Sequence, residues 1–497
     1  MTSAKVKDFF IRYGHIFWLV GIVFIVVTLC SKCSFLYPFN DWEDSNCFFT
    51  VGKAMANGQV LYKDIYEQKG IYLYVLHILA YYISHDTFIG VYLFELVSGG
   101  LFAYATYLLM KLYLDKTRAA VFLPYAVIAA FASVSFCHGD SAEEFIMPLM
   151  AFSLLFMMQY AKGEKLQLYK YALSGAFACI AFWVKFTLCG FFIGWIILAF
   201  VFEILRKDIK HAFLGAATFL GTMLVISIPA FAYFGAKGAL GDMFECYIYN
   251  NMFLYTGEKS SFFKKIGLML WGYGISIGYG LLFYISIIPG FVYIALSKNF
   301  TRFEKAALFT LYAVTNFFIF VGGRRSKYYG LPSCIFSFAG VVALCKLTFT
   351  QKAIDKILKR LALSCGISLV LLAGFSMALS SNTPLMFKKK SDLPQFKFAK
   401  IIKEENPNAT LLNYGSLDKG LYTVAEIVPT CKYFCGLNIQ LPVLTETQNE
   451  WIAEGKTDYV IAAAEPENIY DKYELISVAS YKYEWKTRTY YLYGLKK

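Results

Sequence analysis

The chain has 497 residues, of which 58% are hydrophobic and 16% are charged, and its mean hydropathy is +0.51. Soluble domains carry roughly 25% charged residues, so this composition excludes a water-soluble globular protein and makes the lipid bilayer the first expected partner. The net charge of +13 does not indicate nucleic acid as a partner, because no basic stripe alternates with stacking aromatic residues.

The first apolar run, from Ile16 to Cys30, follows the basic residues Lys5, Lys7 and Arg12. It has no small-residue cleavage site, so we predict a retained first span with the N-terminus in the cytoplasm. Further apolar regions bring the total to about eleven transmembrane helices in an all-α membrane domain. These regions are Phe88–Met110, Ala119–Phe136, Phe145–Tyr160, Tyr171–Lys185, Leu188–Phe202, Ala212–Phe234, Ile266–Leu296, Ala306–Val321, Tyr329–Cys345 and Leu361–Leu379.

The segment from Ile71 to Ser84 is apolar but shorter than the roughly 20 residues that cross a bilayer. If it crossed, the basic groups near Lys111, Lys162 and Arg206 would lie outside, whereas Lys and Arg collect in cytoplasmic loops. We therefore predict an interfacial helix in the outer leaflet. With this topology, the remaining acidic and basic side chains gather on the extracytoplasmic face of the plasma membrane.

From about Asn382 onward, long apolar runs become rare and charges alternate in sign. A helical pattern and several short β-prone segments predict a small extracytoplasmic α/β domain at 382–497. The helical pattern is Phe396–Glu405, and the β-prone segments are Thr410–Tyr414, Tyr459–Ala463 and Thr487–Tyr493. The rest, residues 1–381, forms the transmembrane domain, with its first outer loop at 37–87.

This C-terminal domain has no nucleophile elbow, phosphate loop or metal signature, which favours a supporting or acceptor-docking role. Its two cysteines, Cys431 and Cys435, are four positions apart. A disulfide between them and a pair of free thiols remain open alternatives, whereas a zinc site would need further ligands that are not nearby.

Two charged motifs lie in the first outer loop. Asp41, Glu43 and Asp44 follow the first span directly, and Glu67 and Lys69 precede the interfacial helix. Taken alone, the acidic cluster is also compatible with an ordinary solvated loop. The continuation into a second charged motif favours a functional site.

Three more motifs face outward in the predicted topology. They are Asp140–Phe145 at the start of one span, Gly175–Lys185 within another, and Gly322–Pro332 in a later outer loop. In their order and placement, these motifs resemble those of the C-type integral membrane glycosyltransferases. The likeness is to the branch that contains the protein O-mannosyltransferases and the aminoarabinose transferase of lipid A, and it covers most of the first 380 residues.

The resemblance carries over to individual positions. Counting back from the family-like pattern Lys53–Met55, Asp44 falls on the position of the catalytic aspartate. Lys69 matches the lysine of the motif that opens the interfacial helix, but Gly70 and Ile71 stand where the family has two prolines. The shape of this loop can therefore differ from that of the family.

The resemblance implies an inverting glycosyltransferase that takes a sugar from a polyprenyl-phosphate donor. Asp44 would be the general base that activates the acceptor, and Lys69, Arg324 and Lys185 would stabilise the departing phosphate. For Lys185, snorkelling to the interface is the alternative. Supporting or substrate-binding residues would be Asp41, Glu43, Glu67, His138, Asp140, Glu143, Glu144, Arg325 and Lys327.

The same carboxylates leave a divalent cation open as a cofactor, since some branches of the family use a metal and others do not. The acceptor can be a lipid, a glycan or a protein, and the sequence selects neither it nor the sugar. An envelope polysaccharide polymerase or ligase is the nearest alternative function. A secondary transporter fits less well, because the chain shows no internal repeat and its charges gather at one face.

Overall fold

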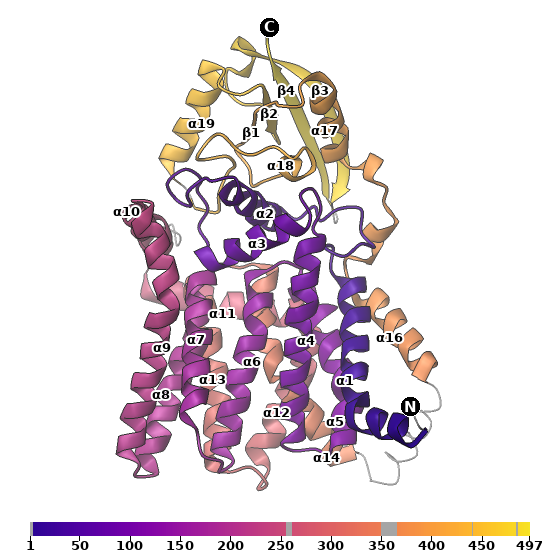
Figure 1. Ribbon diagram of the computed structural model, residues 1–497, viewed down its shortest axis with the longest axis vertical. Coiled ribbons are helices and arrows are strands. Elements are labelled where there is room, and N and C mark those ends of the chain that lie inside the picture. Colours follow the sequence, from indigo (N-terminus) through magenta and orange to yellow (C-terminus); the bar gives the residue numbers. More distant parts are fainter. Residues whose placement is uncertain (1–2, 255–260, 349–364, 440, 484–485) are drawn as a thin grey trace. The chain divides into compact units, whose positions relative to one another are not determined.

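The computed structural model describes residues 3–254, 261–348, 365–439, 441–483 and 486–497 (Figure 1). The chain divides into two compact units. Unit 1 contains residues 1–31, 93–227 and 260–383, and unit 2 contains residues 32–92, 228–259 and 384–497. Unit 2 thus combines most of the predicted outer loop, the predicted C-terminal domain and a third segment. The division into a transmembrane and a soluble domain at residues 381 and 382 remains a prediction.

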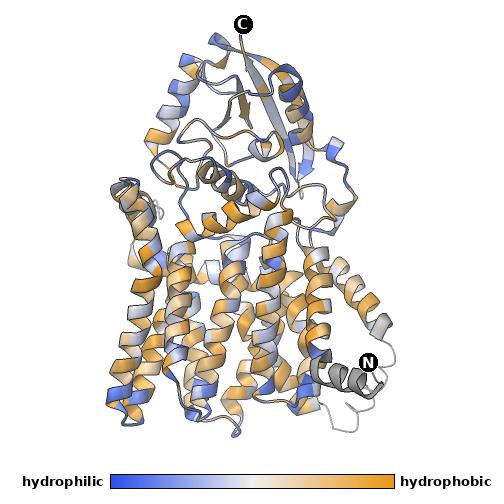
Figure 2. Cartoon of the chain, viewed as in Figure 1, coloured by the Kyte–Doolittle hydropathy of each residue, from blue (hydrophilic) through white to orange (hydrophobic). Residues whose placement is uncertain are grey.

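Unit 1 is built from helices that are mostly hydrophobic along their length (Figure 2). The apolar runs found in the sequence form them, and short polar turns separate one helix from the next. They are α1 (Ser3–Cys30), α4 (Ile89–Lys111), α5 (Lys116–Phe131), η1 (Val134–Phe136), α6 (Ala142–Ala161), α7 (Leu168–Val184), η2 (Phe186–Leu188), α8 (Cys189–Leu205), α9 (Ile209–Ala236), α11 (Phe262–Tyr279), α12 (Leu281–Leu296), α13 (Arg302–Phe320), η4 (Lys327–Phe336), α14 (Phe338–Thr348) and α16 (Cys365–Leu379). The first residues of α4 and the last residues of α9 belong to unit 2.

Among the described residues, 5 helices are long and apolar enough to cross a membrane, or up to 7 if each of two bent pairs counts as one span. The five are α4, α6, Phe186–Leu205, α9 and α13. The shorter apolar helices Gly14–Cys30, Leu168–Val184 and Ser368–Leu379 fall in other predicted spans. The chain therefore has the helices of a multi-pass membrane protein, while the number eleven remains a prediction. The beginning of the predicted span Leu361–Leu379 lies outside the described residues.

The predicted span Ile266–Leu296 consists of two helices, α11 and α12, which meet at an angle of 108°. Gly280 lies at the joint, and a side chain there would collide with the Phe283 ring. A glycine in a long apolar run gave no sign of this bend in the sequence, because the hydrophobic pattern continues through it.

The predicted outer loop in unit 2 carries two packed helices, α2 (Glu43–Ala56) and α3 (Ile71–Ile83). Helix α3 matches the bounds of the predicted interfacial helix to within one residue. The two helices approach closely at Gly52, where an added Cβ would lie 2.6 Å from the Cβ of His77. A larger residue at position 52 would push α2 away from α3. The segment after α9 adds α10 (Leu240–Met243) and the π-helix η3 (Phe244–Leu254) to unit 2.

The C-terminal part of unit 2 contains a mixed four-stranded sheet with the order β1-β2-β4-β3. Strand β1 (Leu411–Tyr414) is parallel to β2 (Tyr459–Ala462), and the long hairpin β3 (Tyr473–Tyr483) and β4 (Lys486–Leu495) completes the sheet. Around it lie η5 (Thr383–Phe387), η6 (Lys390–Asp392), α17 (Pro394–Glu405), α18 (Leu421–Val424), α19 (Pro442–Glu454) and η7 (Ile469–Asp471). The predicted small C-terminal α/β fold is confirmed.

Candidate functional site

The predicted site residues fall into two groups, one in each unit. Unit 2 holds Asp41, Glu43, Asp44, Glu67 and Lys69. Unit 1 holds His138, Asp140, Glu143, Glu144, Lys185, Arg324, Arg325 and Lys327. Each group combines carboxylates with cations, as a site for a phosphate and a sugar requires.

Asp44 is the second residue of α2 and is only 7% exposed. Trp42 precedes the helix and gives no side-chain cap, so the first-turn carboxylates Glu43 and Asp44 supply the negative charge at this end. The positive end of the helix dipole stabilises a carboxylate in the first turn. The fold therefore keeps a carboxyl group shielded from water at position 44.

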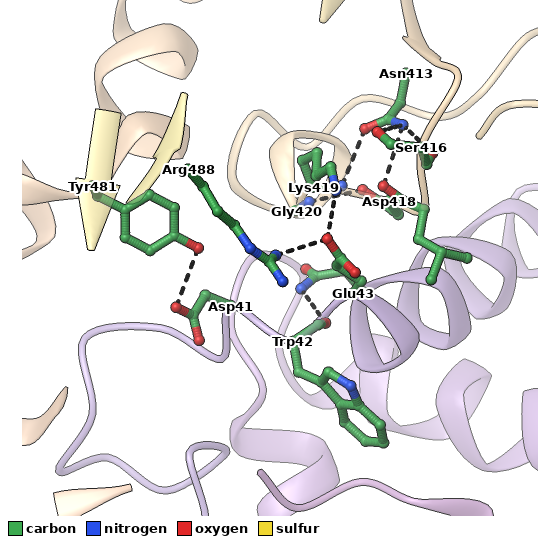
Figure 3. Close-up of polar contacts among 12 residues, drawn as sticks. Asp41, Trp42, Glu43, Asn413, Ser416, Asp418, Lys419, Gly420, Tyr481 and Arg488 are labelled. Atoms are coloured by element: carbon green, nitrogen blue, oxygen red, sulfur yellow. Dashed lines mark hydrogen bonds and ion pairs between the residues drawn. The ribbon is translucent and has the colours of Figure 1, made fainter. Parts of the chain in front are cut away.

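Glu43, beside Asp44, is bound by two cations from the C-terminal part of unit 2 (Figure 3). Its Oε1 accepts from Lys419 Nζ and lies 2.7 Å from Arg488 Nη1. The Arg488 guanidinium stacks on the Tyr483 ring at 3.7 Å, which holds it in place. Glu43 thus anchors the start of α2 to the sheet. Neither Lys419 nor Arg488 was predicted from the sequence.

Asp41 also has two partners, one cation and one phenol. Its Oδ1 lies 2.5 Å from the buried Lys32 Nζ, and its Oδ2 accepts from Tyr481 Oη at 3.3 Å. Burial and the Asp41 carboxylate both raise the pKa of Tyr481, so this phenol keeps its proton and donates a hydrogen bond to Asp41. Asp41 therefore fixes the chain before α2 to strand β3.

Farther along, α2 is held by the segment around Asp418. Thr50 Oγ1 donates to Asp418 Oδ2 at 2.7 Å, and Lys53 Nζ donates to the backbone oxygen of Tyr422 at 2.5 Å. Thr423 donates to Asn46 at 3.1 Å. Burial lowers the pKa of Lys53 to about 7 and raises the pKa of Asp418. The family-like lysine of the Lys53–Met55 pattern thus has a structural contact.

The second motif folds into a compact turn before α3. Lys69 lies with its Nζ 3.8 Å from Glu67 Oε1, and its backbone N–H donates to Glu67 Oε2 at 2.8 Å. Tyr74 also donates to Glu67, because burial and the Glu67 charge raise the pKa of Tyr74 and keep it protonated. Lys69 Nζ lies 5.3 Å from the centre of the Phe48 ring on α2. The structure therefore brings Lys69 to the helix that carries Asp44.

In unit 1, Lys185 ends α7 and is paired with Glu143 at the start of α6, with Nζ 2.5 Å from Oε1. Its ammonium also lies 4.0 Å from the centre of the Tyr329 ring and 5.2 Å from that of Tyr328. Three predicted motifs thus meet at one cation. Within the described part of the chain, Glu143 Oε2 is buried without a hydrogen-bond partner, which is a vacant acceptor beside this lysine.

The turn before α6 is fixed by a carboxylate that the sequence analysis did not single out. Glu95 on α4 accepts from the Asp140 backbone N–H at 2.9 Å and from Ser31 Oγ at 2.6 Å. Glu144 Oε2 accepts from the same N–H at 3.0 Å. Asp140 has φ 65°, so these bonds support a backbone conformation that aspartate rarely adopts. A charge inside an apolar span is the signal that could have identified Glu95.

The remaining predicted residues take other roles. His138 Nδ1 lies 2.9 Å from Asn382 Oδ1, a contact that ties the turn to the end of unit 1. Arg324, Arg325 and Lys327 follow α13 in the predicted outer loop, where Arg324 and Lys327 are half-buried and Arg325 is exposed.

A different group has the spacing of metal ligands. Ligand atoms of Glu203, Asp208 and His211 all lie within 4.8 Å of one another, and they belong to α8, α9 and the turn between them. Glu203 Oε1 and His211 Nδ1 are 2.8 Å apart. Carboxylate and imidazole donors suit a transition metal. Among the described residues, Asp140, Glu143 and Glu144 do not form such a group.

Together, the apolar helices and the C-terminal sheet define a multi-pass membrane protein with two clusters of charged residues. No protein-family model matches the sequence, and no curated protein matches it. Solved structures do match. ArnT from Cupriavidus metallidurans, in complex with undecaprenyl phosphate, shares 14% identity with a TM-score of 0.65, over 97% of this chain and 98% of ArnT. Apo ArnT shares 12% identity with a TM-score of 0.55, over 99% and 98% of the two chains.

The chain therefore has the fold of ArnT over nearly its whole length. The fold that the sequence motifs led us to expect is confirmed.

Proposed function

We propose that this protein is an inverting glycosyltransferase that moves a sugar from a polyprenyl-phosphate donor to an acceptor of the cell envelope. The observation that carries the proposal is the ArnT fold over nearly the full chain, since the ArnT structure holds undecaprenyl phosphate. The shielded carboxylate of Asp44 in the first turn of α2 supports it. A candidate general base in the predicted outer loop is needed for sugar transfer, whereas a transporter would not need one.

In the proposed reaction, an acceptor hydroxyl or amine attacks the anomeric carbon while Asp44 takes its proton. The bond between the anomeric carbon and the phosphate oxygen breaks, and the electron pair leaves with the polyprenyl phosphate. This anion needs positive charge rather than a proton. Lys69, Lys185 and Arg324 would supply that charge.

The topology completes the proposal. About eleven spans, with the N-terminus in the cytoplasm and residues 382–497 outside, would put both charged clusters on the extracytoplasmic face of the plasma membrane. Residues 382–497 would support α2 and dock the acceptor, whether a lipid, a glycan or a protein. Glu203, Asp208 and His211 are the residues that would hold a divalent cation. No step above depends on one.

The test is transfer of radiolabelled sugar from a panel of polyprenyl-phosphate sugars by the purified full-length protein in lipid. Asp44→Asn removes the base but keeps the shape, so transfer should fall about 1,000-fold while donor binding is kept. Asp64→Asn is the matched control, since Asp64 is an exposed carboxylate of the same loop. Undiminished transfer in Asp44→Asn would remove Asp44 as the base.

The same assay separates the alternative functions. A polysaccharide polymerase or ligase would join preformed glycan chains and leave single lipid-linked sugars untouched. If the protein bound none of the lipid-linked sugars and instead moved a solute across vesicles, the transporter alternative would be correct.

A further inference from the structure

Two buried thiols that are far apart in the sequence meet inside unit 2. Cys47 lies on α2, three residues after Asp44, and Cys435 lies between α18 and α19. Their Sγ atoms are 3.7 Å apart, although the residues are separated by 388 positions. Each side chain is only 1% exposed. The sequence drew attention to a different pair, Cys431 and Cys435.

Hydrogen bonds fix the backbone on both sides of this pair. Next to Cys47, the Asn46 backbone N–H donates to the Trp42 oxygen at 3.1 Å, and the Asn46 side chain accepts from the Thr423 hydroxyl at 3.1 Å. Beside Cys435, the Phe434 backbone oxygen accepts from the Asn413 N–H at 3.2 Å, and the Gly436 N–H donates to the Ser416 oxygen at 2.7 Å. The thiols are thus held facing each other. A disulfide bond is about 2.05 Å long, so rotation about the side-chain bonds has only a short gap to close.

Cys431 has a different environment. It packs in the core of the sheet with Leu412 and Val460. Cys435, by contrast, faces α2. The position of Cys435 therefore selects Cys47 as its partner on geometry rather than on nearness in the sequence.

We propose that Cys47 and Cys435 form a disulfide that joins α2 covalently to the C-terminal part of unit 2. Two thiols lose two protons and two electrons, and the disulfide of an extracytoplasmic thiol oxidoreductase accepts them and becomes two thiols. The proposal goes beyond sugar transfer and rests on the extracytoplasmic placement of both residues, where disulfides persist. Its consequence is a covalent anchor one turn from the proposed base.

Burial sets when this bond can form. It raises the pKa of both Cys47 and Cys435, so in the folded protein few thiolates are present to react. The bond therefore forms while the segment around Cys435 folds onto α2. Once the disulfide is buried, reductants in solution cannot reach it.

The test uses the full-length protein, produced in its membrane and treated with N-ethylmaleimide before solubilisation. Peptides prepared without reductant are then analysed by mass spectrometry. The proposal expects a linked pair that contains Cys47 and Cys435, lighter by two hydrogen atoms than the separate peptides. The link should persist in Cys431→Ser, the matched control, and be lost in Cys435→Ser.

Two results would overturn the proposal in the wild-type protein, where folding of a variant is not in question. One is maleimide labelling of both Cys47 and Cys435 after unfolding without reductant. The other is a link between Cys431 and Cys435. These results are independent of sugar transfer, so an enzyme without the proposed activity could still carry the bond.

A second measurement reports on the anchor itself. Unfolding the chain, reducing it and refolding it with the thiols kept reduced should raise hydrogen exchange of the α2 amides about 10-fold in wild type. In Cys47→Ser the same treatment should change nothing. Equal exchange in oxidised and reduced wild type would show that the bond does not anchor α2.

Discussion

The two groups of candidate residues are held in place by different kinds of interaction. In unit 2, Glu43 is bound by Lys419 and Arg488, which lie 376 and 445 positions farther along the chain. In unit 1, Lys185 pairs with Glu143 only 42 positions away. The start of α2 therefore depends on a distant segment of the chain, whereas the ion pair in unit 1 joins two consecutive helices, α6 and α7.

The two ion pairs also differ in their solvent exposure, and this changes what each can contribute. The Glu43 and Arg488 side chains are 20% and 28% exposed, so water and salt weaken their attraction. The Lys185 and Glu143 side chains are 13% and 2% exposed. Removing one partner of a buried pair leaves an uncompensated charge, which costs about 3 to 5 kcal/mol. The unit 1 pair should thus respond more strongly to substitution.

The largest expected effect in this comparison is at Lys185. If its ammonium stabilises the departing phosphate, Lys185→Met should lower sugar transfer about 100-fold, comparable with the loss of one oxyanion-hole donor. The loss should include weaker donor binding, measured as a higher KM. Transfer rates and thermal unfolding of the purified protein provide the two readouts.

A double variant separates the chemical role of Lys185 from its structural one. Glu143→Gln removes the partner, so Lys185→Met with Glu143→Gln leaves no buried unpaired charge and should recover most of the lost stability. Transfer should stay low. Recovery of transfer together with stability would mean that Lys185 serves only to neutralise Glu143.

A smaller effect is expected at the distant anchor of unit 2. Glu43→Gln keeps the shape of the side chain but removes its charge, which should lower stability by about 1 kcal/mol because the pair is partly exposed. Transfer should fall about 10-fold, mainly in kcat, since α2 and Asp44 lose one positioning contact. Hydrogen exchange at the start of α2 should rise in parallel.

Arg488→Met tests whether this anchor acts from the sheet. It should reproduce most of the loss seen in Glu43→Gln, although residue 488 follows Asp44 by more than 400 positions. Raising the ionic strength should narrow the difference between wild type and either variant. The exposed pair of Lys403 and Glu426 provides the control, since Lys403→Met should leave transfer unchanged. A full effect of Glu43→Gln with none of Arg488→Met would assign the anchoring to Lys419 alone.

The sequence predicted the features that depend on local patterns. Long apolar runs predicted the helices of unit 1, and the short run at Ile71–Ser84 predicted α3. The C-terminal change in composition predicted a small α/β fold, although the long strand β3 was not foreseen. The bend at Gly280 was missed, because the apolar pattern runs through it without interruption.

The sequence could not predict which residues fix the start of α2. Lys419, Arg488 and Tyr481 carry no local signal, and their role follows only from tertiary contacts with residues near the start of α2. The sequence missed the neighbour of Cys435 for the same reason. Nearness in the sequence suggested Cys431 for Cys435, while the fold brings Cys47 to it.

The last expected effect is on stability rather than on sugar transfer, and it concerns Lys53, a further contact between α2 and the C-terminal part of unit 2. Unlike the ion pairs, it is a buried ammonium bound to a backbone oxygen. Burial lowers its pKa from 10.5 to about 7 in the folded protein. Between these values the unfolded chain binds more protons than the folded chain, so stability rises with pH across this window. Below pH 7 the destabilisation by the buried charge is complete.

Lys53→Met keeps a long side chain but cannot titrate, so the variant should lose this slope. Thermal unfolding at each pH should show that the stability of the variant relative to wild type is highest near pH 6 and falls toward pH 10 by about 4 kcal/mol, at about 1.4 kcal/mol per pH unit above pH 7. Loss of the hydrogen bond to Tyr422 lowers the free energy of unfolding of the variant by the same amount at every pH, so it does not affect the slope. Lys400→Met, at an exposed position of α17, should keep the wild-type slope. Parallel curves for Lys53→Met and wild type would mean that Lys53 remains charged in the fold, and that α2 is held there by a charge-assisted bond.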